Sequence, residues 1–456
     1  MSGTIGRIGN RAREFLRSHG ISPLRMVLTP QLFDACWPRP TDSRAILIPE
    51  VVFWLMATVG LTGGCSMAAA AEHFWMSLRA VLPYLPSKPV TEEAFCMARK
   101  AMPVRFFVCV FHAVCQRFEQ AFPDRFRWRG LRLLGLDGMK SDLPNHPNLR
   151  RAFPPHNGGK GRSRRPFAVL VGLVGLWDGL CRGFRLVPAG TSEQISAHML
   201  ARHLRPGDLL LCDKNFPGYH LFCRILSRGA EFLFRLPANR YKDCPRLATP
   251  SGRSEEWYVQ PDRPKKLRSK GFLPWTLCLR ICRYQKRGFR PSLLVTSLLD
   301  TQAYPYDELV GLYHERWRQE TMHREWKYTL SLCNLRSHHL RGLLKEVLVQ
   351  LTVNNVARWI MAEASGHPVR PVDLSFLEAK RRIVCTATVM AAAATEALPR
   401  LYRTLLAEIG REVILVRPGR SYPRRHDTQP RNKGHGEVAL PARVTPSQKE
   451  DQDMAA

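Results

Sequence analysis

The order of short apolar segments between residues 131 and 236 limits most strongly what this chain can fold into. The pattern there is three strands, a helix, a strand, a helix and a strand, at 131–137, 167–176, 185–187, 192–204, 208–213, 217–227 and 231–236. Thr191 or Ser192 is available to cap the first helix, and Pro217 to open the second. This order predicts an α/β fold with a mixed sheet covered by helices.

The flanking regions have different patterns. The amino-terminal region is rich in Ala, Leu, Met and Phe and predicts helices, whereas helical periodicity disappears after residue 239 and strand-like runs replace it. Long helices are expected again at 306–330 and 342–363. The predicted parts are a helical domain, the first part of an α/β core, a β-rich insertion, a region of helices and a disordered basic tail, at 1–125, 126–238, 239–300, 301–416 and 417–456.

Composition points to a polyanionic partner. The chain of 456 residues has 69 Lys and Arg against 38 Asp and Glu, a formal net charge of +31. A chain with this positive charge is expected to bind DNA or RNA, and an anionic membrane surface is the second possible partner. The helical amino-terminal domain therefore either contacts DNA or serves only for packing.

A membrane span and a disulfide framework are both disfavoured. The most apolar stretch, 45–64, is interrupted by Pro49 and Glu50, so we expect a buried helix there. The 13 cysteines include no Cys-x2-Cys pair, and the amino terminus lacks a signal-peptide pattern. Cys278 and Cys282 would share one face of a strand. The sequence predicts a cytoplasmic protein with reduced cysteines.

Two acidic residues stand at the carboxyl ends of predicted strands. Asp137 ends the first strand and Asp213 the fourth, and each is followed by residues that break a strand. Carboxylates at this edge of a sheet face the crevice in which α/β proteins bind ligands. Asp142 lies past the end of its strand and Asp208 stands at the start of one, so both are weaker candidates.

A third acid lies in the predicted helix 306–330. Tyr313, Arg316, Glu320 and Lys327 fall at about 0°, 300°, 340° and 320° on an ideal helix, so all four point one way. A carboxylate between two cations and a phenol suits a metal ion and a phosphodiester.

Other side chains of this helix point elsewhere. Glu315 and Glu325 lie about 140° from Glu320 and are expected to be surface charges. Trp317 could stack on a displaced base, but its direction favours packing beneath the helix.

The spacing Tyr313-x2-Arg316-x3-Glu320-x6-Lys327 resembles the signature of bacterial insertion-sequence DDE transposases of the YREK group, also called the insertion-sequence-four type. Leu136-Asp137-Gly138 and the run 211–218 resemble the family's first and second catalytic blocks. The resemblance covers about 131–360. Relatives often carry a small hydroxyl residue where this chain has Gly138, so the local phosphate contact can differ.

The resemblance implies a fold, a chemistry and partners. It implies a ribonuclease H-like core with a β-strand insertion, in which Asp137, Asp213 and Glu320 are catalytic and hold two Mg²⁺ ions, with Mn²⁺ as a substitute. Tyr313, Arg316 and Lys327 would contact DNA phosphates near the cleaved end. The expected activity is metal-dependent DNA cleavage and strand transfer on double-stranded DNA, by a homo-oligomer near the bacterial nucleoid.

Basic segments add candidate DNA contacts, and two alternative functions stay open. One basic segment lies after the first strand, with Lys160, Arg162, Arg164 and Arg165; others lie at 263–270 and 417–433. A ribonuclease H-like nuclease would cut DNA without joining it. A catalytically inactive descendant would only bind DNA.

Overall fold

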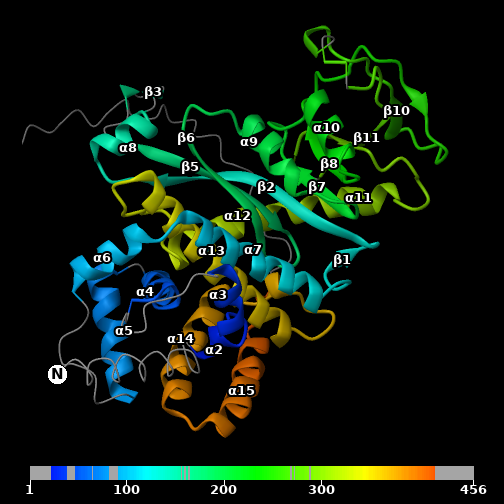
Figure 1. Cartoon of the computed structure of the whole chain (residues 1–456). Helices are drawn as coiled ribbons and strands as arrows, with labels where there is room; N and C mark the ends of the chain where they lie inside the picture. The colour runs from blue at the N-terminus through cyan, green and yellow to red at the C-terminus, as the bar shows by residue number, and fades with distance from the viewer. Residues whose placement is uncertain are drawn as a thin grey trace, which may run out of the picture. The chain divides into compact units, whose positions relative to one another are not determined.

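The computed structural model describes residues 22–37, 47–63, 65–81, 91–155, 157–158, 161–162, 165–267, 270–271, 273–286 and 289–415. Almost all of them belong to one compact unit formed by the chain up to residue 285 and by 291–414. The fold of this unit is shown in Figure 1.

A ten-stranded mixed sheet forms the centre of the fold. Its order is β6-β5-β2-β7-β8-β12-β11-β10-β9, with β1 paired to β2. The strands are β1 (Arg127–Trp128), β2 (Leu131–Asp142), β5 (Phe167–Gly175), β6 (Cys181–Pro188), β7 (Asp208–Cys212), β8 (Glu231–Leu236), β9 (Leu247–Ala248), β10 (Glu256–Val259), β11 (Leu279–Tyr284) and β12 (Ser292–Thr296). A separate pair consists of β3 (Asn157–Gly158) and β4 (Gly161–Arg162).

The sheet contains both antiparallel and parallel pairs of strands. Strands β2, β5 and β6 pair antiparallel, whereas β2, β7 and β8 run parallel. Every residue of β7 is buried, as expected for a parallel strand that is covered on both faces. The predicted mixed α/β sheet is confirmed.

Helices cover both faces of the sheet (Figure 1). They are α2 (Ser22–Arg25), α3 (Pro30–Cys36), α4 (Pro49–Leu61), α5 (Met67–Val81), α6 (Glu92–Ala101), α7 (Val104–Ala121), α8 (Pro147–Ala152), α9 (Glu193–Leu200), α10 (Tyr219–Leu226), α11 (Tyr306–Tyr313), α12 (Trp317–Arg324), α13 (Leu340–Ala364), α14 (Phe376–Ala392) and α15 (Leu398–Gly410). Helices α9 and α10 bury one core against β2, β5, β7 and β8. Helices α7 and α13 belong to a second core on the opposite face, together with the amino-terminal helices.

The predicted β-rich insertion is a continuation of the main sheet. Strand β12 pairs antiparallel with β8, and β11, β10 and β9 follow outward. Cys282 is buried in β11, but Cys278 precedes this strand and is exposed, so the two do not share a strand face as predicted. The division of the chain at the predicted domain boundaries stays a prediction, and the tail 417–456 lies outside the described residues.

The apolar stretch around residue 50 forms α4, as predicted. Twelve of its thirteen residues, from Glu50 to Leu61, are buried within the amino-terminal helices. Glu50 is neutralised there by Arg25, whose Nη1 lies 3.1 Å from its Oε1. In the described part of the chain, no helix is both long enough and apolar enough to span a membrane.

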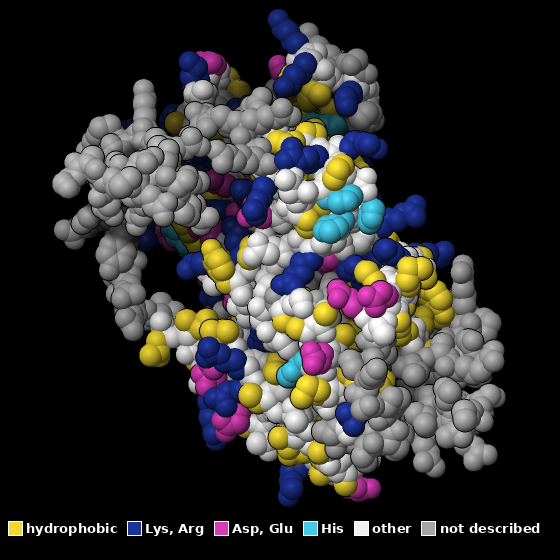
Figure 2. All heavy atoms as spheres, turned by 90° about the vertical axis from the view of Figure 1, so that its left-hand side faces the viewer, with side chains coloured by type: hydrophobic (Ala, Val, Ile, Leu, Met, Phe, Trp, Pro, Cys, Tyr) yellow, Lys and Arg dark blue, Asp and Glu magenta, His cyan; other side chains and the backbone are white. Residues whose placement is uncertain are grey.

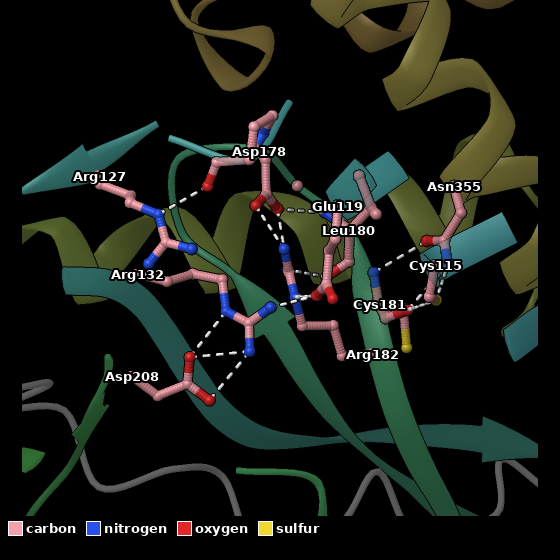
Figure 3. A network of polar contacts seen from close by, with 12 residues as sticks. Cys115, Glu119, Arg127, Arg132, Asp178, Leu180, Cys181, Arg182, Asp208 and Asn355 are labelled. Atoms are coloured by element: carbon pink, nitrogen blue, oxygen red, sulfur yellow. Dashed lines mark hydrogen bonds and ion pairs between the residues drawn. The ribbon is translucent and has the colours of Figure 1, made fainter. Parts of the chain in front are cut away.

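A buried polar network holds together the starts of β2 and β7 (Figure 3). Arg132 and Asp208 are register partners, and the guanidinium Nε and Nη2 donate to Oδ1 and Oδ2 at 2.8 and 2.9 Å. Arg132 also pairs with Glu119 of α7. Arg182 of β6 pairs with Glu119 and, at 2.7 Å, with Asp178. One set of ion pairs therefore joins α7, β2, β6 and β7.

Candidate active site

The sheet register brings Asp137 and Asp213 together. In the parallel pair of β2 and β7, Arg132 lies opposite Asp208 and Gly135 opposite Leu211, a constant offset of 76 residues. The same offset separates Asp137 from Asp213 (213 − 137 = 76), which directly follows β7. Side chains at matching positions of parallel neighbours point to the same face, so the two carboxylates lie side by side.

Two glycines allow the helix with Glu320 to lie directly on this part of the sheet. A Cβ on Gly135 of β2 would lie 2.4 Å from Oε1 of Gln319. A Cβ on Gly172 of β5 would lie 2.8 Å from two ring carbons of the fully buried Trp326. Gln319 also donates from Nε2 to the Gly172 carbonyl at 3.2 Å. The helix approaches the sheet more closely than a side chain at either glycine would permit.

The predicted helix 306–330 is helical throughout but not regular. It consists of α11, a 3₁₀ turn at His314–Arg316, α12 and a π-helical turn at Glu325–Thr329. Three residues make one full turn of a 3₁₀ helix, which places Arg316 directly above Tyr313. The guanidinium Cζ of Arg316 lies 5.9 Å from the centre of the Tyr313 ring. The π turn changes the direction of every later side chain, including Lys327.

Arg316 faces the three carboxylates. Its Nη2 lies 3.6 Å from Oε1 of Glu320. Burial lowers the pKa of Arg316, but Tyr313, Asp213, Glu320 and Asp137 together raise this pKa above its usual value. Arg316 is therefore the internal cation of the acidic cluster.

Asp137 has an unfavourable environment for a charge. Burial raises the pKa of its carboxyl group, and Glu320 and Asp213 raise this pKa further. The backbone N–H of Gly138, which donates to Oδ1 at 2.9 Å, and the charge of Arg316 oppose the shift only in part. The cluster has more negative charge than Arg316 neutralises.

Tyr313 lies buried next to Asp213. Burial raises the pKa of its hydroxyl group, with Asp213 adding to the shift and Arg316 opposing it. The hydroxyl group donates to the carbonyl of Cys212 at 3.5 Å, a long contact. Tyr313 is therefore a neutral phenol that supports the loop carrying Asp213.

The cluster has the chemistry of a cation site, but its side chains are not gathered around one point. Oδ1 of Asp213 is buried without a hydrogen-bond partner among the described residues. Carboxylate oxygens are the ligands that hard divalent cations prefer. Within the described ranges, however, no three His, Cys, Asp or Glu side chains are close enough to share an ion.

A fourth carboxylate, Glu193, lies beside the cluster and was not predicted from the sequence. It is the first residue of α9, after Ser192, whose hydroxyl group accepts from the N–H of Gln194 at 3.2 Å. Burial raises the pKa of Glu193, and Asp137 and Asp213 raise this pKa further. The sequence does predict the helix and its cap, but nothing in the local spacing connects Glu193 with Asp137, 56 positions earlier (193 − 137 = 56).

Lys327 and two further acids, Asp142 and Asp208, have neighbours outside this cluster. Lys327 is next to His323, whose pKa is lowered to about 4 by burial and by the Lys327 charge. Asp142 is exposed and lies 3.3 Å from Lys140. Asp208 is held by Arg132 at the opposite end of β7 from Asp213. Strand β2 continues to Asp142, so the predictions that Asp137 ends this strand and that Asp142 lies past its end are wrong. The weaker ranking of Asp142 and Asp208 stays a prediction.

The basic segment after the first strand is described only in part. Lys160 and Arg164 lie outside the described residues, and Arg162 is placed in β4 without a described side chain. Arg165 is exposed just before β5. The predicted role of these residues in binding DNA stays a prediction.

Three predictions about the helical run 306–330 are wrong. Glu315 is not a surface charge, because Trp177 donates to it at 2.9 Å and Arg318 and Arg370 pair with it. Glu325 is also no surface charge, since it pairs with Arg358, which is 1% exposed. Trp317 does not pack beneath the helix: it is 50% exposed, with Cζ of Arg316 5.0 Å from its ring centre. Ideal helix angles fail here because the 3₁₀ and π turns alter the directions of the side chains. They also take no account of the cations Arg358 of α13 and Arg370, which come from outside the helix.

A basic surface with histidines lies near the amino end of α8. Figure 2 shows histidines grouped together on this side of the molecule, with Lys and Arg side chains around them. The rings of His146 and His338 stack with centres 5.0 Å apart, and His339 lies 5.8 Å from His146. Arg150 and Arg151 follow on α8 and are exposed. This surface suits a polyanion.

Comparison with protein-family models identifies the family of this chain. The family described as "Transposase DDE domain" matches residues 129–356. The chain is 25% identical over 408 residues to transposase InsG for insertion sequence element IS4 of Escherichia coli (strain K12), covering 87% of this chain and 90% of that protein. Among solved structures, it resembles the piggyBac transposase synaptic complex with hairpin DNA at a TM-score of 0.45 and 11% identity, covering 89% of this chain and 88% of that one.

Proposed function

The chain belongs to the transposase DDE-domain family, and from this premise we propose that it cuts and joins DNA at the ends of an insertion sequence. Asp137, Asp213 and Glu320 are proposed as its catalytic residues. The observation that carries this assignment is their convergence: β2, β7 and α12 place three carboxylates within electrostatic reach of one another and of Arg316.

The three carboxylates are proposed to hold two divalent ions, Mg²⁺ or its substitute Mn²⁺. Two considerations support this. The cluster consists of hard oxygen donors with one unpartnered buried oxygen, on Asp213, and its negative charge exceeds that of Arg316. When bound, such ions activate the attacking hydroxyl and stabilise the leaving oxygen of a phosphodiester.

The remaining residues of the motif have proposed roles on the DNA. Arg316 offers a forked guanidinium suited to two oxygens of one phosphate, and its present partner Glu320 is only loosely held at 3.6 Å. Lys327, seven residues after Glu320 (327 − 320 = 7), supplies a point charge for a phosphate. Tyr313 is buried, so we assign it to positioning Arg316 and the loop after β7. Exposed Trp317 is available for stacking on a base.

The proposed partners are double-stranded DNA at the element's ends and at the target. The net charge of +31 and the basic histidine surface near α8 support a long contact with the phosphate backbone. Joining two ends requires that they be held together, so a homo-oligomer on DNA is proposed. The proposed location is the cytoplasm, at the nucleoid.

A labelled DNA end from the flanks of the gene tests this function. The wild-type chain should cut the end and join it to target DNA in Mg²⁺. Glu320→Gln should reduce both reactions by at least about 1,000-fold, because the neutral amide is a poor metal ligand, while DNA binding persists. Asp142→Asn, which changes an exposed acid outside the cluster, serves as the control.

The same assay separates the alternatives. Metal-dependent cutting without joining by the wild-type chain would favour a ribonuclease H-like nuclease. Binding without any chemistry would favour an inactive DNA-binding descendant. Equal activity of the wild type and Glu320→Gln would contradict the proposed site.

A further inference from the structure

We propose that Glu193 is a fourth carboxylate of the active site, which strengthens the binding of divalent ions by Asp137 and Asp213 from outside their ligand set. This inference rests on the proposed metal-dependent function and extends it to a positioning residue on a different element, α9.

Backbone geometry places Glu193 over the middle of β2, next to the residue that follows Asp137. A Cβ on Gly138 would lie 2.9 Å from Oε1 of Glu193, so the carboxylate lies directly over the residue that follows Asp137. Val169 crowds the same position, because its Cγ1 would also lie 2.9 Å from that Cβ. Gly138 is therefore the residue that leaves room for Glu193.

The start of α9 is also tied to the loop after β7. Gln194, next to Glu193, donates from Nε2 to the carbonyl of Asn215 at 3.0 Å. Asn215 lies two residues after Asp213. The first turn of α9 thus bridges the chain segments that carry Asp137 and Asp213, and Glu193 faces both.

The Glu193 carboxylate has no partner of its own in the described part of the chain. No described side chain forms a hydrogen bond or ion pair with it, although it is half-buried. Burial, Asp137 and Asp213 all raise the pKa of Glu193. Since Arg316 is the cation facing the cluster, four carboxylates remain undercompensated until a further cation arrives.

The absence of a partner among the described residues fits a carboxylate that acts beside the metal ligands better than a carboxylate that only stabilises the fold. A structural carboxylate normally has a cationic or N–H partner, as Glu315 and Glu325 have here. An acid held near the ligands adds attraction for a divalent ion and accepts hydrogen bonds from the ion's water molecules. Glu193 would therefore act on metal affinity and not on the recognition of DNA.

The test is Glu193→Gln, with Glu92→Gln as a matched control. Glu92 is likewise the first residue of a helix, α6, and follows a capping residue, Thr91, whose hydroxyl group accepts from the N–H of Ala94 at 3.2 Å. Glu92 is exposed and belongs to the amino-terminal helices. Both variants lose one charge at a helix start, so a general effect of the helix dipole would affect both.

The measurement is Mn²⁺ binding by calorimetry to the full-length chain in complex with the labelled DNA end. Glu193→Gln should weaken Mn²⁺ binding by about 10–100-fold, the range found for groups that support metal ligands. Affinity for DNA without metal should stay unchanged. Cleavage should need correspondingly more Mg²⁺ and recover at saturation, and Glu193→Asp should restore part of the metal affinity. Glu92→Gln should behave as the wild type.

Each contrary outcome is distinct. Equal Mn²⁺ affinity of the wild type, Glu193→Gln and Glu92→Gln would overturn the role of Glu193 and leave the proposed function intact. Loss of DNA affinity in Glu193→Gln would also overturn it. No Mn²⁺ binding by the wild-type chain would remove the proposed metal chemistry itself, and the inference with it.

Discussion

At the scale of a single residue, Asp137 has a position that disfavours its charged form. Its carboxyl group is held close to other acids, and burial and these neighbours raise its pKa above the ordinary value. The proton is therefore bound more tightly in the folded chain than in the unfolded one. The contribution of Asp137 to stability is fully present below the unfolded pKa and is lost as the pH rises through the folded pKa.

At neutral pH and without metal, the ionised Asp137 thus destabilises the fold, and removing its charge should stabilise it. Asp137→Asn should raise the melting temperature in EDTA by about 1–3 °C at neutral pH. The gain should shrink toward about pH 4, where the wild-type carboxyl group is protonated. Thermal unfolding of both chains across this range tests it.

The matched control is Asp142→Asn, because Asp142 is exposed and paired with Lys140. A melting temperature of Asp137→Asn that stays below the wild type at neutral pH would contradict this account of the site. The prediction agrees with the general finding that catalytic groups are kept at a cost in stability.

At the scale of an element, the position of Glu320 depends on how the catalytic helix rests on the sheet. Gly135 and Gly172 provide the close approach, and Gln319 and Trp326 fill it. Trp326 also donates from its indole nitrogen to Asn354 of α13 at 3.1 Å. The helix is therefore held between the sheet and α13, and Glu320 has little freedom to shift along β2.

Gly172→Ala should push the helix off the sheet. The new methyl group would lie 2.8 Å from the Trp326 ring, in a fully buried place. We expect a loss of about 1–3 kcal/mol in the free energy of unfolding, typical of overpacking, together with a large loss of DNA cleavage. Urea unfolding and the cleavage assay measure the two effects.

Gly311→Ala provides the control within the same helical run. A Cβ on Gly311 of α11 meets nothing within 4 Å, so the change should increase stability by about 1 kcal/mol through helix propensity. Wild-type stability in Gly172→Ala would show that Trp326 can move without cost, and the docking argument would fail.

At the scale of the whole molecule, the polar network in Figure 3 connects segments that are far apart in the sequence. It lines a cavity of about 570 Å³ and joins α7 to three strands of the sheet. Asp208 is 1% exposed and forms an ion pair with Arg132. The ion pair of Arg132 with Asp208 stabilises the parallel register of β2 and β7, and this register brings Asp137 close to Asp213.

Arg132→Met should therefore lower the free energy of unfolding by more than the small change in side-chain volume would explain. Removing one partner leaves Asp208 and Glu119 without their shared cation, and a loss of about 3–5 kcal/mol is expected for a broken buried pair. Urea denaturation measures the loss. Arg129→Met, which breaks an exposed pair with Glu308, should change little. Equal effects of the two variants would contradict a structural role for the network.

The amino-acid sequence by itself determined the order of strands and helices, the apolar helix α4 and the motif with Glu320. These features repeat at the periods of a strand or a helix, or stand at fixed spacing, so they are readable locally. Asp137 and Asp213 are likewise local signals, because each follows a run of apolar strand residues, although β2 continues past Asp137 to Asp142.

Tertiary structure alone decided the features that depend on distant partners. It placed Glu193 over Gly138, paired Glu325 with Arg358 and extended the sheet with β9–β12. It also exposed Trp317 through the irregular turns of its helix. The physical reason is that packing between remote segments, and the burial and charge it creates, is set by the whole fold and leaves no regular spacing in the chain.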